Sequence, residues 1–261
     1  MPTLPPTPPP FPTLSDDELM RYSRQILMPA FDIEGQQSLK SARVLIVGCG
    51  GLGCPAALYL GSAGVGHLVL ADDDIVESAN LQRQIGFSEA DLGKSKAQAL
   101  AKRLNAINPL VMVTAVSSRL AGDKLQNAIS EADLVLDCSD NFATRFAIND
   151  ACLKARTPLV SGAAIRAQGQ ITVFDSRQSD SPCYRCLFPD EGEQELTCSE
   201  AGVIGPLVGM IGSAQAMEAI KVLTGKGKPL LGRLLILDAW TMEWRSMGLS
   251  KDPNCGACSQ T

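Results

Sequence analysis

The chain has 261 residues, 45% of them hydrophobic, and its 23 basic and 28 acidic side chains give a formal net charge of -5. A chain of this length can bury one large core, and it has neither a basic excess for nucleic acid nor an apolar run near the ~20 residues that span a membrane. We therefore expect a compact cytoplasmic protein with a single domain over residues 14–261, preceded by a Pro-rich disordered tail over residues 1–13.

The first structural signal is a buried strand that runs into a glycine turn. The apolar run 44–47 predicts the strand, and a helix is expected to begin near Leu52. The turn contains the closely spaced glycines Gly48, Gly50, Gly51 and Gly53. Glycine allows a tight turn, a close approach of the backbone to a ligand and close packing of the helix on the strand. Phosphate would bind at the N-terminus of that helix, where free N–H groups and the helix dipole favour an anion.

A second predicted strand, 67–72, supplies an acid at its end. Asp72 lies about 20 residues beyond the last glycine, where nucleotide-binding folds hold a ribose hydroxyl. Asp73 and Asp74 continue an acidic run that is typical of a solvated loop, although Asp74 is also a candidate cofactor contact.

The next segments carry cations that a nicotinamide cofactor would not use. Asn80, Arg83 and Gln84 place a guanidinium and two carboxamides on a segment too polar for the core. A nucleoside triphosphate needs such preorganised donors, because charge shifts along its phosphates during reaction. Lys96 opens an expected helix over 96–104 and is either a further phosphate ligand or an ordinary first-turn lysine.

A third predicted strand, 134–137, is followed by Asp140 and Asn141, again at the edge where open parallel sheets bind ligands. Asp140 holds a magnesium ion or caps the helix expected over 142–156, and the residues alone favour neither. Asn141 is a candidate nucleotide contact beside it. Strands alternating with helices predict an α/β fold, Rossmann-like and doubly wound, with its nucleotide-binding half at about 40–160.

The C-terminal half, about 161–261, is expected to extend this mainly parallel sheet with strands at 170–175 and 234–238 and a buried helix over 208–223. It also contains two close cysteine pairs: Cys183, Cys186, Cys255 and Cys258. Four thiolates in two such pairs are typical of a structural zinc site, whereas two disulfides would need an oxidising compartment. We expect a zinc staple that ties the tail to a loop near the sheet.

Together these motifs resemble the MoeB/ThiF group, the bacterial relatives of ubiquitin-activating enzymes, over roughly residues 14–258. The segments that carry the resemblance are 21–27 (RYSRQIL), 48–53 (GCGGLG), 80–84 (NLQRQ), 137–141 (DCSDN), 183–186 (CYRC) and 201–203 (AGV). Segments 161–171 and 196–203 look more like MoeB, which acts in molybdenum cofactor biosynthesis. Segments 21–24, 71–74 and 183–190 also suit ThiF, which performs the same chemistry in thiamine biosynthesis.

The resemblance implies an ATP-dependent adenylyltransferase. In this group the C-terminal glycine carboxylate of a small ubiquitin-like sulfur-carrier protein, ending in Gly-Gly, attacks the α-phosphate of ATP, and an acyl-adenylate and pyrophosphate form. Asp72 would then hold the ribose, and Asp140 the Mg²⁺. Arg83 and Lys96 would hold the phosphates. Arg24, on a short helix with a capping box at Ser15, would reach into the other subunit's site of a homodimer; the alternative is a solvated arginine.

Cys198 matches the position of an acceptor cysteine for thioester or persulfide chemistry, for which a sulfur-donor protein is a further partner. Its acidic surroundings favour a bystander instead. A groove for the carrier tail is expected around 164–170. Trp240 and Trp244 line such a groove or cover the edge of the sheet.

Two other classes of protein remain open. An NAD-dependent oxidoreductase would use the same glycine turn and Asp72, but the lone histidine, His67, is no credible proton donor. A non-catalytic zinc-stapled binding protein would explain the cysteines but not the cations and Asp140.

Overall fold

A single eight-stranded sheet organises the computed structural model, which describes residues 12–188 and 201–259. The spatial order is β3-β2-β1-β4-β5-β6-β7-β8. The strands are β1 (Arg43–Val47), β2 (His67–Ala71), β3 (Met112–Val116), β4 (Leu134–Asp137), β5 (Leu159–Ile165), β6 (Gln168–Phe174), β7 (Arg233–Asp238) and β8 (Glu243–Gly248). The first five of these strands in the spatial order are parallel, and the three at the other end pair antiparallel.

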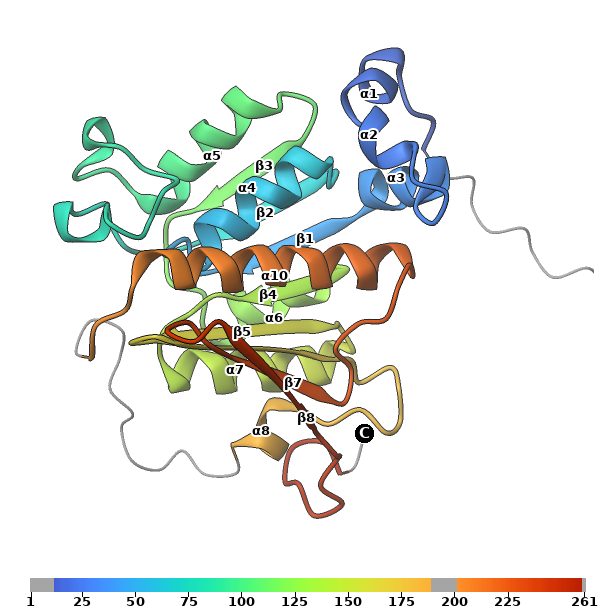
Figure 1. Ribbon diagram of the computed structural model, residues 1–261, viewed down its shortest axis with the longest axis vertical. Coiled ribbons are helices and arrows are strands. Elements are labelled where there is room, and N and C mark those ends of the chain that lie inside the picture. The colour runs from blue at the N-terminus through green and yellow to red at the C-terminus, as the bar shows by residue number, and fades with distance from the viewer. Residues whose placement is uncertain (1–11, 189–200, 260–261) are drawn as a thin grey trace, which may run out of the picture.

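Helices cover both faces of the sheet (Figure 1). One face packs against α4 (Gly53–Ala63), α5 (Lys96–Ile107) and α10 (Gly205–Thr224), and the other against α6 (Gly122–Ser130) and α7 (Phe142–Ala155). The short helices are α1 (Asp16–Arg21), α2 (Ser23–Ile26), α3 (Asp32–Ser41), α8 (Tyr184–Leu187), η1 (Ser78–Asn80) and η2 (Glu89–Asp91). Among the described helices, none is long and apolar enough to cross a bilayer.

The topology places a crevice between β1 and β4. The chain runs from β1 outward to β2 and β3 and then returns to the other side of β1 as β4. Helices that leave the ends of β1 and β4 therefore diverge to opposite faces, and ligands of open α/β sheets bind at such a switch point, outside the carboxyl ends of the strands.

The predicted α/β class, with a mainly parallel sheet and C-terminal extension, is confirmed, but three strands were not anticipated. β3 and β8 are edge or near-solvent strands without a clean apolar alternation, and every residue of β8 is exposed. β5 was also missed. The capping box at Ser15 is confirmed, yet the helix it starts ends at Arg21. Arg24 therefore lies on the following helix, α2, and not on the capped one.

Candidate functional site

A cavity of about 950 Å³ opens at the carboxyl edge of the sheet, over the switch point between β1 and β4. Ten of the predicted cofactor contacts line it: Gly48, Gly50, Gly51, Asp72, Asp74, Arg83, Gln84, Lys96, Asp140 and Asn141. Gly53 and Asn80 are buried and do not line it. Asn80 instead starts the turn that carries Arg83, because its carbonyl accepts hydrogen bonds from the N–H groups of Arg83 and Gln84.

The glycine turn is forced by close contacts that no side chain would permit. Gly48 has a φ of +95°, and a Cβ there would lie 2.6 Å from the carbonyl oxygen of Cys138 on the neighbouring β4 loop. A Cβ on Gly53 would lie 1.9 Å from the Gly48 oxygen. No side chain caps the N-terminus of α4. The N–H of Cys54 bonds to the Gly50 carbonyl and Pro55 has no N–H, so the donors that remain for an anion here are those of the glycine turn itself, Gly50 to Gly53.

Asp72 ties the turn to the end of β2. Its two carboxylate oxygens accept hydrogen bonds from the N–H of Cys49 at 2.6 Å and of Asp74 at 2.9 Å. Burial raises the pKa of Asp72, and the two N–H donors and the Lys96 charge oppose that rise. The side chain thus holds the glycine turn in place while it lines the cavity, as a ribose ligand must.

Two cations at the cavity wall, Lys96 and Arg83, form no ion pair with a buried acid among the described residues. Lys96 is only 6% exposed, and its Nζ donates to Asp74 Oδ2 at 2.9 Å, whereas Asp74 itself is exposed. Arg83 makes one hydrogen bond, to the carbonyl of Ala79. Lys96 is therefore turned inward and not solvated as an ordinary first-turn lysine would be, and its role as a phosphate ligand stays a prediction.

Gln84 adds a polar group without a partner. It is buried, it packs beside Gly50, and its Oε1 has no hydrogen-bond partner among the described residues. A buried carbonyl-type oxygen left unpaired costs about 1–3 kcal/mol. A ligand donor in the cavity would recover that cost.

The alternative in which Asp140 caps the helix after β4 is wrong, because the cap is Asn141. The Asn141 Oδ1 accepts from the N–H of Thr144 at 2.9 Å, and α7 ends at Ala155, with Arg156 as a left-handed cap. Asp140 is exposed at the cavity, and among the described residues its carboxylate accepts one long hydrogen bond, from Asn141 Nδ2 at 3.5 Å. Its carboxylate is thus free of a capping role and open to a cation.

Beneath this loop lies a buried polar support that sequence reasoning missed. Asp137, fully buried at the end of β4, accepts hydrogen bonds from the N–H and hydroxyl of Ser139. The Gln215 amide of α10 donates to the Asp137 carbonyl at 2.8 Å, and Arg145 of α7 donates to the Ser139 carbonyl. The loop that presents Asp140 is therefore anchored from both helical layers.

The cavity continues along strands β5 and β6. Its wall there is uncharged and combines the small residues Ala163, Ala164 and Gly169 with Ile165, Gln168 and Gln170. This is the region expected for the groove of a carrier tail. Trp240, in the turn after β7, and Trp244, on edge strand β8, do not line the cavity, so they form no part of this groove.

Three further wall residues, Ser118, Arg119 and Leu120, follow β3 and were missed because that strand was not predicted.

The cysteines at the turn are no nucleophiles. Burial raises the pKa of Cys49 and of Cys138 well above the ordinary thiol value, so neither is ionised near neutral pH.

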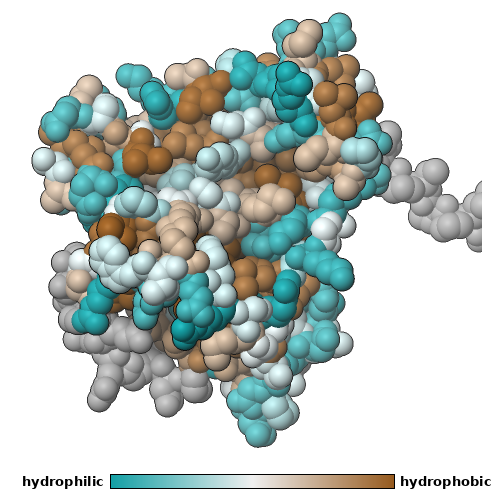
Figure 2. Space-filling view, viewed as in Figure 1, coloured by the Kyte–Doolittle hydropathy of each residue, from teal (hydrophilic) through white to brown (hydrophobic). Residues whose placement is uncertain are grey.

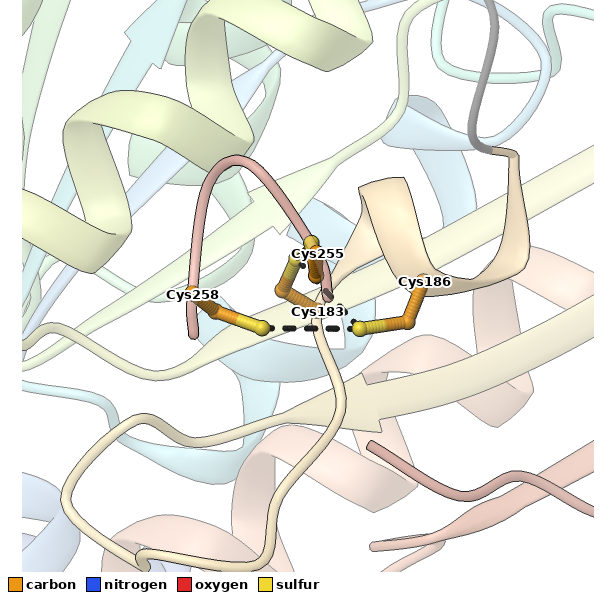
Figure 3. Close-up of side chains that lie close together, drawn as sticks. All are labelled: Cys183, Cys186, Cys255 and Cys258. Carbon is orange, nitrogen blue, oxygen red and sulfur yellow. Dashed lines mark hydrogen bonds between the residues drawn. The ribbon is translucent and has the colours of Figure 1, made fainter. Parts of the chain in front are cut away.

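The four predicted metal ligands converge at a second site (Figure 3). Their sulfur atoms all lie within 4.8 Å of one another, with separations of 3.9 Å for Cys183 and Cys186, 3.7 Å for Cys183 and Cys255, and 3.4 Å for Cys186 and Cys258. A tetrahedron with zinc–sulfur bonds of about 2.3 Å has edges of about 3.8 Å, so the arrangement fits zinc and is far too wide for disulfides. Burial raises the pKa of Cys255, but the N–H groups of Ala257 and Cys258 and the thiols of Cys258 and Cys183 lower it to about 7, whereas burial raises the pKa of Cys183 to about 12. Of these two thiols, Cys255 is thus the one that gives up its proton to a metal more readily.

The cysteine cluster is fastened to the helix that follows the Asp140 loop. The N–H of Tyr184 donates to Asn149 Oδ1, and Arg185 pairs with Asp150 and lies 4.5 Å from the centre of the Phe146 ring. Tyr184 also lines the cavity. The cluster thus supports a wall of the candidate active site from behind.

Arg24 does not line the cavity. Arg24 is exposed on α2 and has no hydrogen bond or ion pair with any described residue. Cys198 lies outside the described residues, so its role stays a prediction. His67 lies at the amino end of β2, at the edge of the sheet opposite to the cavity.

The comparisons with known proteins agree with this geometry. The chain is 53% identical over 247 residues to the molybdopterin-synthase adenylyltransferase of Escherichia coli K12, covering 95% of this chain and 99% of that protein. It is 48% identical over 245 residues to the sulfur carrier protein ThiS adenylyltransferase of the same organism, covering 94% and 97%. Among solved structures, that of E. coli MccB with MccA-N7isoASN matches with a TM-score of 0.82 at 24% identity, over 92% of this chain and 74% of that one, a likeness of fold. Residues 22–257 match the model of the ThiF family, and the chain belongs to that family.

Proposed function

We propose that the chain is an adenylyltransferase that uses ATP to activate the C-terminal glycine carboxylate of a small ubiquitin-like sulfur-carrier protein, in molybdenum cofactor biosynthesis. The observation that carries the proposal is a single cavity with two chemically different ends. One end has the glycine turn, cations that include Arg83 and Lys96, and the exposed carboxylate of Asp140, and the other end is an uncharged wall along β5 and β6. A triphosphate fits the first end and an extended Gly-Gly tail the second.

The cavity arranges the groups that this reaction needs. An oxygen of the carrier carboxylate attacks the α-phosphorus, the bond to the bridging oxygen breaks, and pyrophosphate leaves with that bond's electron pair. Arg83 and Lys96 meet the charge that builds on the phosphates and on the leaving group. Asp72 orients the ribose. Mg²⁺ would be held by Asp140 and would neutralise phosphate oxygens.

Zinc would be bound by the four clustered cysteines as a closed structural site. All four positions of a tetrahedral ion are taken by thiolates, so no position is open to substrate. The ion would hold α8 and the tail segment at 255–258 together, and through Tyr184 it would keep the cavity wall in place.

A homodimer is favoured by the outer surface of the helical layer. No charged residue occurs between Gly205 and Met217 of α10. Exposed apolar side chains lie on or beside the neighbouring helices: Leu27, Met28, Ile33, Tyr59 and Met217. Figure 2 shows hydrophobic side chains gathered over the N-terminal helices. Such a patch is typical of an interface between subunits.

The position of Arg24 supports a site that two subunits share. Helix α4 starts at the glycine turn, and Gln25, next to Arg24, bonds to the Ala63 carbonyl at its other end. Eleven helical residues span about 16 Å, so Arg24 is separated from its own phosphate site by the length of that helix. We infer that its guanidinium serves the partner's cavity.

The deciding experiment is carrier-dependent ATP–pyrophosphate exchange. A purified carrier ending in Gly-Gly should support exchange, and the same carrier lacking its last glycine should not, because the attacking carboxylate is withdrawn from the cavity. Parallel reactions with carriers of the molybdopterin and thiamine pathways decide between the two pathways, and the 48% identical relative keeps the thiamine carrier as the second candidate. No exchange with either carrier, together with tighter binding of NAD than of ATP, would refute the proposal.

A further inference from the structure

The residues on both sides of Arg24 are held by buried side chains from other elements. Asn108 Nδ2 donates to the Tyr22 hydroxyl and to the Gly61 carbonyl, both at 2.8 Å. Gln25 Nε2 donates to Gln36 Oε1 at 2.7 Å and to the Ala63 carbonyl at 3.1 Å. We name Tyr22, Gln25, Gln36 and Asn108 the carboxamide clamp.

The carboxamide clamp forms hydrogen bonds with the last turn of α4. Gln36 Nε2 also donates to the Ala63 carbonyl, at 2.9 Å, so both carboxamides bond to the same carbonyl, one that the helix end leaves unpaired. Gly64 makes room for them: its φ is +89°, and a Cβ there would lie 2.5 Å from the Tyr22 ring and 2.7 Å from Gln36 Nε2. Gln36 and Asn108 are 0% and 1% exposed.

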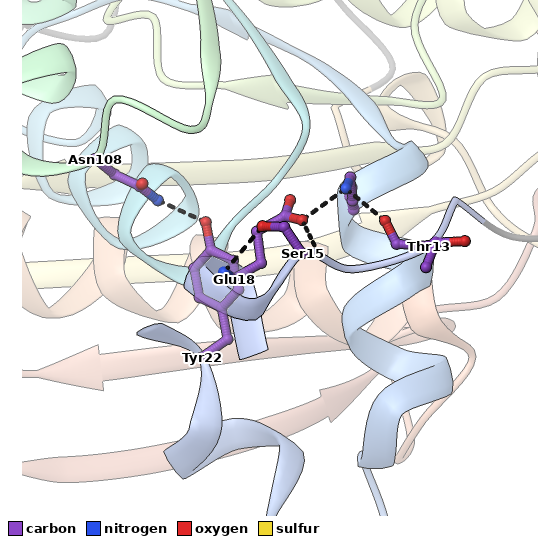
Figure 4. A network of polar contacts seen from close by, with 6 residues as sticks. Thr13, Ser15, Glu18, Tyr22 and Asn108 are labelled. Carbon is purple, nitrogen blue, oxygen red and sulfur yellow. Dashed lines mark hydrogen bonds and ion pairs between the residues drawn. The ribbon is translucent and has the colours of Figure 1, made fainter. Parts of the chain in front are cut away.

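A second contact set fixes the preceding helix, as Figure 4 shows. Glu18 closes the capping box with Ser15 and accepts from Lys40 Nζ at 2.7 Å, and the same ammonium donates to the Thr13 carbonyl. The N-terminal segment is thus fastened to α3 before it reaches Tyr22. Between the fixed residues Tyr22 and Gln25, the exposed side chain of Arg24 has no hydrogen bond or ion pair with any described residue.

A helix of four residues has no stability of its own, so α2 depends on these contacts for its shape. If α2 were mobile, each docking of Arg24 would have to order its backbone as well as the arginine side chain. A backbone fixed in the free subunit removes that cost and places the guanidinium in advance.

We propose that the carboxamide clamp is a positioning device that fixes the backbone of α2 so that Arg24 enters the partner subunit's cavity already oriented. The proposal rests on the shared site proposed above. The clamp explains Tyr22 and Gln25 in the segment 21–27, which the proposed chemistry itself does not use. The C-terminal end of α4 would then influence catalysis through the placement of Arg24, although no clamp residue touches the substrate.

The test is the variant Gln36→Met, which keeps the volume and removes the carboxamide, with Gln37→Met on the same helix as matched control. We expect kcat for carrier adenylation to fall about tenfold, while the KM for ATP changes less than about twofold, because the variant's own cavity is intact. Gln37→Met should behave as wild type. Tyr22→Phe, which removes one oxygen, should lower kcat about threefold and serves if Gln36→Met folds poorly.

The defect should also be repaired from the other subunit. In mixtures with Asp140→Ala under confirmed subunit exchange, a heterodimer combines the intact cavity of the Gln36→Met chain with the well-held Arg24 of the Asp140→Ala chain, so that site should regain wild-type kcat. An unchanged kcat in both clamp variants overturns the proposal. It is also overturned if Asp140→Ala restores the activity of Arg24→Ala in the mixture but does not restore that of Gln36→Met. If Arg24→Ala itself is not repaired by Asp140→Ala, the shared site is wrong and the clamp proposal fails with it.

Discussion

The two edges of the same parallel strands are built differently. At the amino edge, most polar groups bond to one another: Arg43 pairs with Glu131 at 2.8 Å, its backbone N–H donates to Asp133, and His67 bridges Arg43 and Thr114, although Arg43 Nε has no partner among the described residues. At the carboxyl edge, Arg83, Gln84 and Asp140 face a cavity with few partners of their own. Both edges belong to the same strands, so the strands themselves do not cause this difference. We interpret the paired groups of the amino edge as contributors to stability and the sparsely paired groups of the carboxyl edge as candidate ligand contacts.

The largest expected effect tests the carboxyl edge. Lys96→Ala and Arg83→Ala should each reduce carrier adenylation on the order of 100-fold, because one preorganised donor to a charge-developing group is lost. Thermal unfolding should change little for Arg83→Ala, whose side chain makes one hydrogen bond within residues 12–188 and 201–259. The control is Lys94→Ala, an exposed lysine two residues before Lys96 that pairs with Asp91. Exchange rates near those of wild type in both variants would contradict the phosphate assignment.

Asp140 tests whether this edge also holds a metal. Asp140→Ala should raise the Mg²⁺ concentration needed for half-maximal activity, on the order of 10-fold or more, while ATP binding measured without carrier changes less. Asp123→Ala, an exposed acid at the start of α6, is the matched control. Equal losses of nucleotide binding and of the Mg²⁺ response would show that Asp140 acts on the nucleotide and not through a cation.

The cysteine cluster tests a support that lies behind the edge. Cys186→Ser should lower zinc affinity more than about 100-fold, beyond the 10–100-fold that loss of an outer-shell partner typically costs, and should lower the melting temperature with it. Cys152→Ala is the control, since it removes a buried thiol of the core and leaves the cluster intact. Full zinc content of Cys186→Ser by elemental analysis would contradict the staple.

Local patterns in the sequence predicted the parts of the site that depend on short spacing. The glycine turn, Asp72 and the two cysteine pairs follow from residue types a few positions apart, and the structure brings each set together. The features that the sequence could not predict arise from contacts between residues far apart in the chain. The burial of Lys96 arises from packing of α5, and the partners of Gln36 and Asn108 come from α4 and α2. The strand β3 was missed because its exposed Met112 is apolar, so the sequence over 112–116 lacks the apolar–polar alternation that marks a half-buried strand.

The smallest effect is expected at the amino edge, where the readout is stability and not activity. Burial lowers the pKa of His67, and the neighbouring Arg43 charge lowers it further. The neutral ring accepts from Arg43 Nη1 at Nδ1 and donates from Nε2 to Thr114, so protonation would place a second cation against the guanidinium. Because the folded pKa lies below the unfolded value of about 6.5, this contribution is fully present above pH 6.5 and is lost as the pH falls through the folded pKa.

His67→Gln should therefore lose less stability than wild type on acidification. The measurement is the change in melting temperature between pH 7.5 and pH 5, taken for both proteins. Their carboxylates are the same, so the difference between the two changes reports the histidine alone. Adenylation at pH 7.5 should be within about twofold of wild type, since His67 lies at the edge opposite the cavity. An identical pH response in both proteins would show that the histidine makes no pH-dependent contribution. A large loss of activity would instead show that the amino edge is coupled to the site, and the separation between the two edges would then be wrong.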